Sequence, residues 1–291
     1  MTTATFNNPD TVVGIRGLRK RRGTFTLHDL NLDIPRGYVL GLAGTNASGK
    51  TTIINSITGA LIPDAGNIRA PTSERIGVVL DTPFYPQHWT AENIEHASAP
   101  FYPTWSPQRY RDLLHRLRVP LHTKIKNLSR GQSMKLQAAA ALAHNPELLI
   151  LDEPTAGLDP LTRDDLLDLV AEYMENPNHS TLYSSHITTD LERISDHLLL
   201  LHQGRAIYHG PTLDLLENYR LIRGNLHDLN HPNRRHLYGL RVHAAGFEAH
   251  APTHVVNTWP RPSWSNAPPS TPSLSPSLKD TLPQLQETSH E

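Results

Sequence analysis

One glycine-rich segment has the residue types and the spacing needed to hold the phosphates of a nucleotide. Residues 44–51 read GTNASGKT, which fits the phosphate-loop pattern G-x-x-x-x-G-K-[ST]. An apolar run precedes this segment and a helical pattern follows it, so backbone N–H groups and a helix N-terminus can surround a phosphate. We expect Lys50 to reach the β- and γ-phosphates of ATP and Thr51 to place its hydroxyl on Mg²⁺. The residues expected to contact the nucleotide in this segment are Gly44, Thr45, Asn46, Ala47, Ser48, Gly49, Lys50, Thr51 and Thr52.

Two carboxylates follow a second apolar run and have the chemistry to complete such a site. Residues 148–151 (LLIL) predict a buried strand, and Asp152 and Glu153 come directly after it. In phosphate-loop enzymes an aspartate at such a strand end holds Mg²⁺, so we expect Asp152 to bind the metal through water. Glu153 is then expected to act as the general base that polarises the attacking water.

The elements that must position these residues alternate between strands and helices over residues 11–210. Helical patterns separate four apolar runs of strand length, at 38–44, 76–80, 148–151 and 180–184. Strands that alternate with helices predict an α/β fold built on a parallel sheet with both faces covered. An antiparallel pattern at 12–34 precedes this sheet, and residues 198–208 predict a hairpin after it.

A polar turn between the two nucleotide motifs carries a family resemblance. Residues 128–132 read LSRGQ, and on their own they predict only a helix that Ser129 caps. In this position the turn resembles the signature sequence of ABC ATPases, which reads LSGGQ, with Arg130 as a common variation. The order continues with residues 156–159 (AGLD), which resemble the D-loop of that family, and with His186, which resembles its switch histidine. The chain is therefore similar to ABC ATPases over the whole alternating region.

The resemblance implies a fold and a partner. ABC ATPases are P-loop NTPases with a RecA-like core, an antiparallel β subdomain and a helical subdomain, which we expect here at about residues 82–145. Two such domains pair head to tail, as a homodimer or a heterodimer. ATP then lies between the phosphate loop of one domain and the signature of the other, and closure on ATP drives attached subunits.

The same resemblance assigns roles to residues outside the phosphate loop. Ser129, Gly131 and Gln132 of the signature would contact the nucleotide that the partner domain holds. Asp159 would lie at the seam between the two domains. His186 would hold the γ-phosphate and the attacking water, which makes it the second expected catalytic residue beside the general base.

Several positions near the expected nucleotide depart from the family's usual residues. The strand at 76–80 leads to Asp81, where the family has glutamine, and a carboxylate there can still bind Mg²⁺ through water. The aromatic residue on which the family stacks adenine corresponds to Arg22, whose guanidinium plane can also stack on a base, and Phe25 is the nearby alternative. Ala47 replaces a glycine of the loop and costs about 1 kcal/mol if its φ is positive.

Further segments resemble one branch of the family, the YtrB-like exporters of Gram-positive bacteria. They are residues 81–85 (DTPFY), 101–105 (FYPTW), 121–129 (LHTKIKNLS) and 184–191 (SSHITTDL). The resemblance implies an ATP-binding and ATP-hydrolysing subunit on the cytoplasmic face of the cell membrane. Such a subunit drives a separate polytopic membrane subunit in the export of drugs or antimicrobial peptides. The alternative is an ABC ATPase outside transport, such as a cluster-assembly ATPase.

The composition of the chain excludes several other kinds of site. None of its 291 residues is cysteine, which excludes disulfides, thiolate metal sites and a cysteine nucleophile. The 27 Lys and Arg residues nearly balance the 28 Asp and Glu residues, so no overall positive field points to a nucleic-acid partner. The apolar runs are far shorter than the roughly 20 residues that span a bilayer, so a membrane function would need another polypeptide.

The composition changes after residue 210. Residues 211–261 predict a small C-terminal extension, in which 240–247 predicts one strand or hairpin arm. Residues 262–291 are rich in proline and serine. They bury too little apolar surface to offset the entropy of ordering, and we expect this tail to be disordered.

Overall fold

The computed structural model describes residues 10–230, 232–244 and 246–256, and its largest sheet has six strands. In spatial order these are β5 (Ile76–Val79), β6 (Leu148–Asp152), β7 (Ser180–Ser185), β3 (Val39–Gly44), β8 (His197–His202) and β9 (Arg205–Pro211). Neighbouring strands are parallel from β5 to β8, and β8 and β9 form an antiparallel hairpin. The parallel α/β core and the hairpin that the sequence predicts are therefore confirmed.

The apolar runs form these strands because both faces of the sheet are covered. In β6, Leu148 and Ile150 belong to one hydrophobic cluster, whereas Leu149 and Leu151 belong to the other. This alternation follows from the period of two along a strand, and a strand buried on both faces reads as a continuous apolar run. Because the strands are parallel, the carboxyl ends of β3, β6 and β7 meet at one edge of the sheet.

Helices flank this sheet on both sides. They are α1 (Lys50–Ile57), α5 (Pro160–Tyr173), α6 (Thr188–Ile194) and α7 (Thr212–Asn218). Helix α1 packs through Ile53, Ile54 and Ile57 into the cluster that also contains the N-terminal strands. Helix α5 packs through the apolar face that includes Leu166 and Val170 into the opposite cluster. The helix after the phosphate loop is therefore held between two sheets, which fixes the direction of its N-terminus.

A second, antiparallel sheet covers α1. Its strand order is β2 (Phe25–Pro35), β1 (Thr11–Arg22) and β4 (Ala65–Arg69). Strands β1 and β2 account for the antiparallel pattern seen in the sequence. Strand β4 is a short, largely exposed segment that reads AGNIR, so it has no apolar alternation from which it could be predicted.

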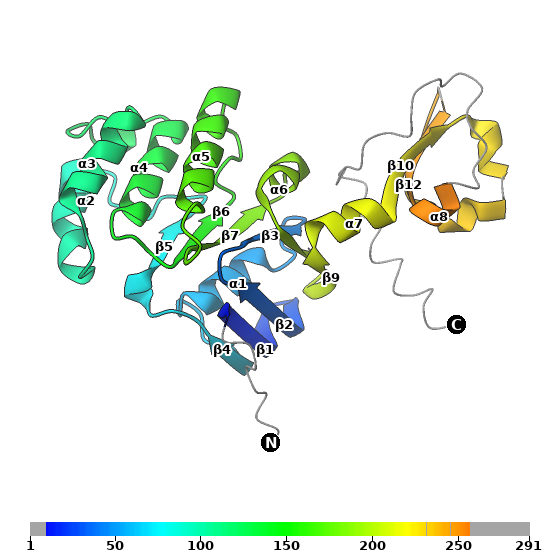
Figure 1. The fold of residues 1–291 in the computed structure, drawn as a ribbon, viewed down its shortest axis with the longest axis horizontal. Helices are drawn as coiled ribbons and strands as arrows, with labels where there is room; N and C mark the ends of the chain where they lie inside the picture. Colours follow the sequence, from blue (N-terminus) through cyan, green and yellow to red (C-terminus); the bar gives the residue numbers. More distant parts are fainter. Residues whose placement is uncertain (1–9, 231, 245, 257–291) are drawn as a thin grey trace.

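A group of helices lies at one end of the molecule (Figure 1). It contains α2 (Ala91–Ser98), α3 (Pro107–Arg116) and α4 (Arg130–Leu142), with the short 3₁₀ turns η2 (Ala99–Phe101) and η3 (Ile125–Asn127), and η1 (Ser73–Arg75) precedes β5. Ser106 caps α3 by accepting a hydrogen bond from the Arg109 amide at 3.1 Å, as the Ser-Pro pair indicates. The fully buried Tyr110 donates to the Ala91 carbonyl at 3.0 Å and ties α3 to α2.

The C-terminal residues form a third sheet at the opposite end of the molecule (Figure 1). Its order is β10 (Tyr219–Gly224), β12 (Gly246–Pro252) and β11 (Tyr238–His243), accompanied by η4 (Leu226–Asn230), η5 (Pro232–His236) and α8 (Thr253–Val256). The one strand or hairpin arm expected at 240–247 is in fact the turn region of the β11–β12 hairpin. The expected disordered tail at 262–291, and the end of the extension at 257–261, lie outside the described residues. Among the described residues, no helix has the length and apolar character to cross a membrane.

Candidate nucleotide-binding site

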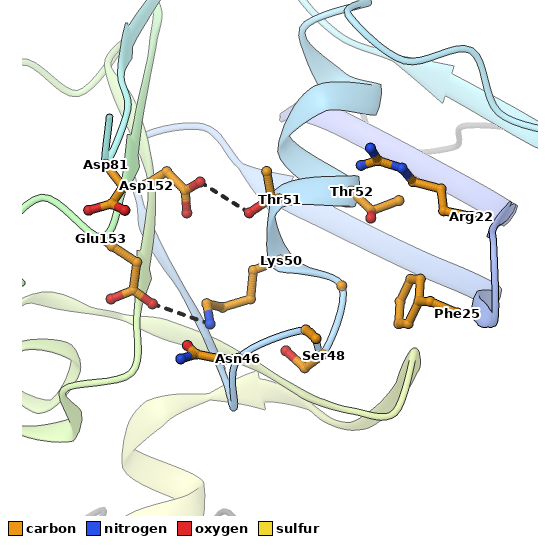
Figure 2. Close-up of a pocket in the computed structure, with 12 residues that line it drawn as sticks. Arg22, Phe25, Asn46, Ser48, Lys50, Thr51, Thr52, Asp81, Asp152 and Glu153 are labelled. Atoms are coloured by element: carbon orange, nitrogen blue, oxygen red, sulfur yellow. Dashed lines mark hydrogen bonds and ion pairs between the residues drawn. The ribbon is translucent and has the colours of Figure 1, made fainter. Parts of the chain in front are cut away.

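A pocket of about 530 Å³ opens where β3 and β6 end, and most of the expected nucleotide contacts line it. Its walls are Arg22, Phe25, Asn46, Ala47, Ser48, Gly49, Lys50, Thr51, Thr52, Asp81, Asp152 and Glu153. Figure 2 shows the phosphate loop in the middle, the carboxylates on one side and Arg22 with Phe25 on the other. Gly44 and Thr45, at the start of the loop, are not among the lining residues, and neither are the signature residues, Asp159 or His186.

The phosphate loop has a backbone that explains its residue types. Gly49 has φ 116°, a conformation that glycine adopts without strain, and it is the cap residue before α1. Ala47 has φ 64°, so the cost of placing a methyl-bearing residue there, about 1 kcal/mol, applies. A side chain at Gly44 would place its Cβ 2.8 Å from the Leu201 carbonyl, which explains why the first position must be glycine.

Lys50 and Glu153 face each other across the pocket (Figure 2). The Lys50 ammonium lies 3.2 Å from Oε1 of Glu153 and donates to the Gly44 carbonyl at 2.9 Å. The other carboxylate oxygen of Glu153, Oε2, lies 2.6 Å from Nδ1 of His186 and accepts a hydrogen bond from its backbone amide at 3.2 Å. The expected base therefore joins the phosphate-loop lysine to the switch histidine, although His186 itself lies outside the pocket lining.

Glu153 also has an unusual backbone. Its φ is 52°, a left-handed conformation that is uncommon for residues other than glycine and is found at functional sites. Its amide donates to the Ser184 carbonyl at 3.0 Å, so the turn after β6 is fastened to the end of β7. The neighbouring strand thus holds the strained residue in place.

Asp152 and Thr51 supply oxygen atoms that suit Mg²⁺. The Thr51 hydroxyl donates to Oδ2 of Asp152 at 3.3 Å, and Ser184 donates to Oδ1 at 2.8 Å. Burial raises the pKa of Asp152 above its ordinary value, and these two hydrogen bonds oppose that rise. The described residues contain no group of three or more His, Asp or Glu that could hold a metal alone. The carboxylate of Asp152 and the hydroxyl of Thr51 are the kind of oxygen donors that Mg²⁺ takes, since Mg²⁺ is commonly held by one or two carboxylates together with substrate phosphates and water.

Asp81 lines the pocket, and it also has a partner that the sequence did not reveal. Its Oδ1 lies 2.5 Å from Nη2 of Arg130, the residue at the first position of α4. Nε of the same guanidinium donates to the Ala156 carbonyl at 2.8 Å. The sequence shows only that an acidic residue and a basic residue each stand where the family has uncharged ones, and nothing in it indicates that the two pair.

The remaining signature residues and Asp159 occupy two helix N-termini on the surface. Ser129 caps α4 by accepting from the Gln132 amide at 3.1 Å, and the Gln132 side chain accepts from the Ser129 amide at 3.1 Å. Asp159 caps α5 by accepting from the Thr162 amide at 3.0 Å, and this hydrogen bond lowers the pKa of Asp159. Both caps are outside the chain's own pocket, so contact with a partner's nucleotide stays a prediction for Ser129, Gly131, Gln132 and Asp159.

Both candidates for the adenine contact line the far side of the pocket. Arg22 and Phe25 pair across the tight β1–β2 turn. A Cβ built on Gly49 would lie 2.9 Å from the Phe25 ring, so this ring packs against the phosphate loop. Arg22 is exposed and lies next to it (Figure 2). The geometry therefore favours a supporting role for Phe25 and leaves the Arg22 guanidinium available for the base.

Replacing Arg22 with alanine is expected to weaken ATP binding by about fivefold or more, because stacking on a base contributes roughly 1–3 kcal/mol. Affinity for tripolyphosphate, which has no base, should not change. Titration of both ligands checks this, and Arg21→Ala is the matched control because Arg21 is a neighbouring cation outside the pocket lining. Equal weakening of both ligands by Arg22→Ala would mean that Arg22 contacts phosphate instead.

These observations define the class of the protein: a P-loop nucleoside triphosphatase whose phosphate loop, Asp152 and Glu153 share one pocket. The ABC transporter family model matches residues 27–156. YdbJ of Bacillus subtilis, an uncharacterised ABC transporter ATP-binding protein, is 32% identical over 66% of this chain and 67% of its own length. YtrB of the same organism is 31% identical over 69% of this chain and 72% of its own length. BcrA of Bacillus licheniformis, a bacitracin transport ATP-binding protein, is 29% identical over 76% of each chain.

Solved structures agree with this comparison. An ATP-binding subunit of an ABC transporter superposes with a TM-score of 0.65 at 27% identity, over 70% of this chain and 92% of that one. The chain belongs to the ABC transporter ATP-binding proteins, which bind and hydrolyse ATP. The family that the motifs predict is therefore confirmed, and YtrB is among the relatives, as the resemblance of the shorter segments indicates.

Proposed function

We propose that this chain is the ATP-hydrolysing subunit of an exporter and that it drives a separate polytopic membrane subunit from the cytoplasmic face of the cell membrane. We further propose that it works in a pair with a second ABC ATPase domain. The observation that carries the enzymatic part is the line of contacts from Lys50 through Glu153 to His186. It gives the pocket a cation for the phosphates, a base for the water and a histidine behind that base.

The contacts indicate how this chain's own residues would act. When ATP enters, its phosphates offer Lys50 more negative charge than Glu153 does, so the lysine would turn to the β- and γ-phosphates. Glu153 would then be free to take the proton of the attacking water, and His186 would hold the carboxylate and the γ-phosphate in line. Mg²⁺, held through Thr51, Asp152 and Asp81, would neutralise charge that develops on the phosphates.

Export is supported by segments that resemble the YtrB-like branch and by the functions of several relatives. LnrL of Bacillus subtilis, a linearmycin resistance ATP-binding protein, is 30% identical, and BcrA serves bacitracin transport. NikO of Rhodobacter capsulatus, a nickel import ATP-binding protein, is 31% identical. Overall identity therefore does not separate exporters from importers. We base the proposed export direction on the local segments, and the proposed cargo class on the bacitracin transport of BcrA and the linearmycin resistance of LnrL.

A pull-down tests this proposal most directly. Tagged Glu153→Gln protein is purified from detergent-solubilised cells with ATP and Mg²⁺, and its partners are identified by mass spectrometry. We expect one polytopic membrane protein in stoichiometric amount, and its sequence class would show whether the complex exports or imports. The matched control is Glu172→Gln, which removes an exposed carboxylate of α5, should hydrolyse ATP as the wild type does and should recover the same partner. Recovery of soluble partners alone would contradict the transporter and favour an ATPase of the cluster-assembly kind.

A further inference from the structure

The Arg130 side chain joins three segments that are far apart in the sequence. It stands at the first position of α4, one residue after the Ser129 cap. Nη2 pairs with Asp81 at 2.5 Å, and Nε donates to the Ala156 carbonyl at 2.8 Å. Gly157 is close enough that a Cβ built on it would lie 3.6 Å from Nε of Arg130. One guanidinium thus connects the signature turn, the segment after β5 and the segment before Asp159.

A second contact between α4 and the segment after β5 is of a different kind. Gln137 is 1% exposed; its side chain accepts from the Leu80 amide at 3.2 Å and donates to the Leu80 carbonyl at 3.0 Å. Arg130 and Gln137 are seven residues apart, so they lie on the same face of the helix. The buried Gln137 contact fastens the middle of α4 to Leu80, and the Arg130 contact fastens its N-terminus to the next residue, Asp81.

The Arg130–Asp81 pair is exposed to solvent, whereas the Gln137 contact is buried. The Arg130 side chain is 47% exposed and that of Asp81 is 50% exposed. Ion pairs this exposed contribute little to stability and exchange readily with water and ions. Asp81 also lines the nucleotide pocket, beside Asp152 and Thr51, where a cation that accompanies the phosphates would compete with Arg130 for the same carboxylate.

We propose that Arg130 is a positioning residue that, with Asp81, forms a latch on the signature turn. The latch holds the N-terminus of α4 against Asp81 and the Ala156 carbonyl. When Mg·ATP enters the pocket, Asp81 turns toward the cation and Arg130 is released, so the signature turn and the segment leading to Asp159 become free to meet the second domain. The effect of releasing Arg130 rests on the proposed pairing of two domains. The Arg130–Asp81 contact itself lies within one chain, so it can be tested without a partner.

The latch is tested first without any nucleotide. Hydrogen–deuterium exchange is measured by mass spectrometry on peptides that cover residues 128–134 and 154–159. Arg130→Gln and Asp81→Asn should each speed exchange of the 128–134 peptide by roughly twofold to fivefold, because each removes the ion pair. Arg130→Gln should also speed exchange of the 154–159 peptide, because it removes the hydrogen bond to the Ala156 carbonyl as well. The double variant should be no faster than Arg130→Gln alone. Arg116→Gln is the matched control, since it removes an ion pair on α3 whose arginine is also 47% exposed. The latch would be overturned if the two substitutions had additive effects on the exchange rate, or if neither changed that rate.

The competition for Asp81 is tested by binding and needs no turnover. The measurement uses a Glu153→Gln background at concentrations where light scattering shows a monomer. Arg130→Gln should then lower the Kd for Mg·ATP by about threefold, because Asp81 can turn to the cation without first breaking its ion pair with Arg130. The Kd for ATP in EDTA should not change, and adding Asp81→Asn should abolish the gain. A Kd that moves equally with and without Mg²⁺ would show that Arg130 has only a structural role. Failure to find a membrane partner would affect neither measurement.

Discussion

Replacing Glu153 with glutamine is expected to lower the rate of ATP hydrolysis by about 10²–10⁴-fold while ATP still binds. The amide keeps the shape of the side chain but cannot take a proton from the attacking water. Binding should be kept or strengthened, because Lys50 then no longer has a carboxylate 3.2 Å from its ammonium to compete with the phosphates. Steady-state phosphate release and equilibrium binding of ATP, measured on the same preparation, separate the two effects.

The surrounding contacts supply controls for this prediction. Glu172→Gln removes a carboxylate that pairs with Arg116 on the surface, and its turnover should match that of the wild type. His186→Ala removes the ring whose Nδ1 lies 2.6 Å from Glu153, and turnover should fall with little loss of binding. Turnover of Glu153→Gln within tenfold of the wild type would mean that another group, or water alone, accepts the proton.

The chemistry of the site was predictable from the sequence because it depends on contiguous motifs. A phosphate loop brings its own strand, turn and helix, so Gly44 to Thr52 could be named before any packing was known. The parallel sheet then places strand ends together, which explains why Asp152 and Glu153 could be placed beside the loop from one apolar run. For Ala47 the sequence indicates only the cost of a positive φ as a condition, and the structure shows that the condition is met.

Contacts between distant segments were not predictable, because no local pattern encodes them. The Arg130–Asp81 pair joins residues 49 positions apart, and each residue on its own reads as a substitution in a different motif. The contact of Glu153 with both Lys50 and His186 likewise depends on how β3, β6 and β7 align. Elements with weak apolar patterns were missed as well: β4 is polar and exposed, and β10 begins in a region where the composition had already changed.

A buried ionic network behind the site carries the largest expected effect on stability. Asp190 is fully buried and lies four residues after His186. Its carboxylate accepts from Nε of Arg163 at 2.5 Å, from the Thr155 hydroxyl at 2.5 Å and from the Tyr183 hydroxyl at 3.4 Å. Burial, and next the Asp190 charge, raise the pKa of Tyr183, so its hydroxyl keeps the proton that it donates. The network fastens the turn that follows Glu153 to the helix that follows His186.

Replacing Asp190 with alanine is expected to lower the free energy of unfolding by about 3–5 kcal/mol, because it leaves two buried hydroxyls and the partly buried Arg163 without their acceptor. Urea denaturation in the absence of nucleotide measures this loss. Asp190→Asn should cost less, since the amide oxygen still accepts hydrogen bonds. Arg163→Met leaves the buried carboxylate without its cation, so it should also destabilise strongly, and the double variant Asp190→Asn/Arg163→Met should cost less than the sum of the two.

The control for this network is an arginine on the outside of the same helices. Arg193 pairs with Asp164 at 2.6 Å and with Asp168 at 3.2 Å, and its side chain is 50% exposed. Arg193→Gln should therefore change the free energy of unfolding by less than about 1 kcal/mol. If Asp190→Ala cost no more than this surface variant, the network would not be holding the two catalytic turns together. A large loss confined to Asp190 and Arg163 would instead show that a buried contact between the segments that carry Glu153 and His186 contributes strongly to the stability of the fold.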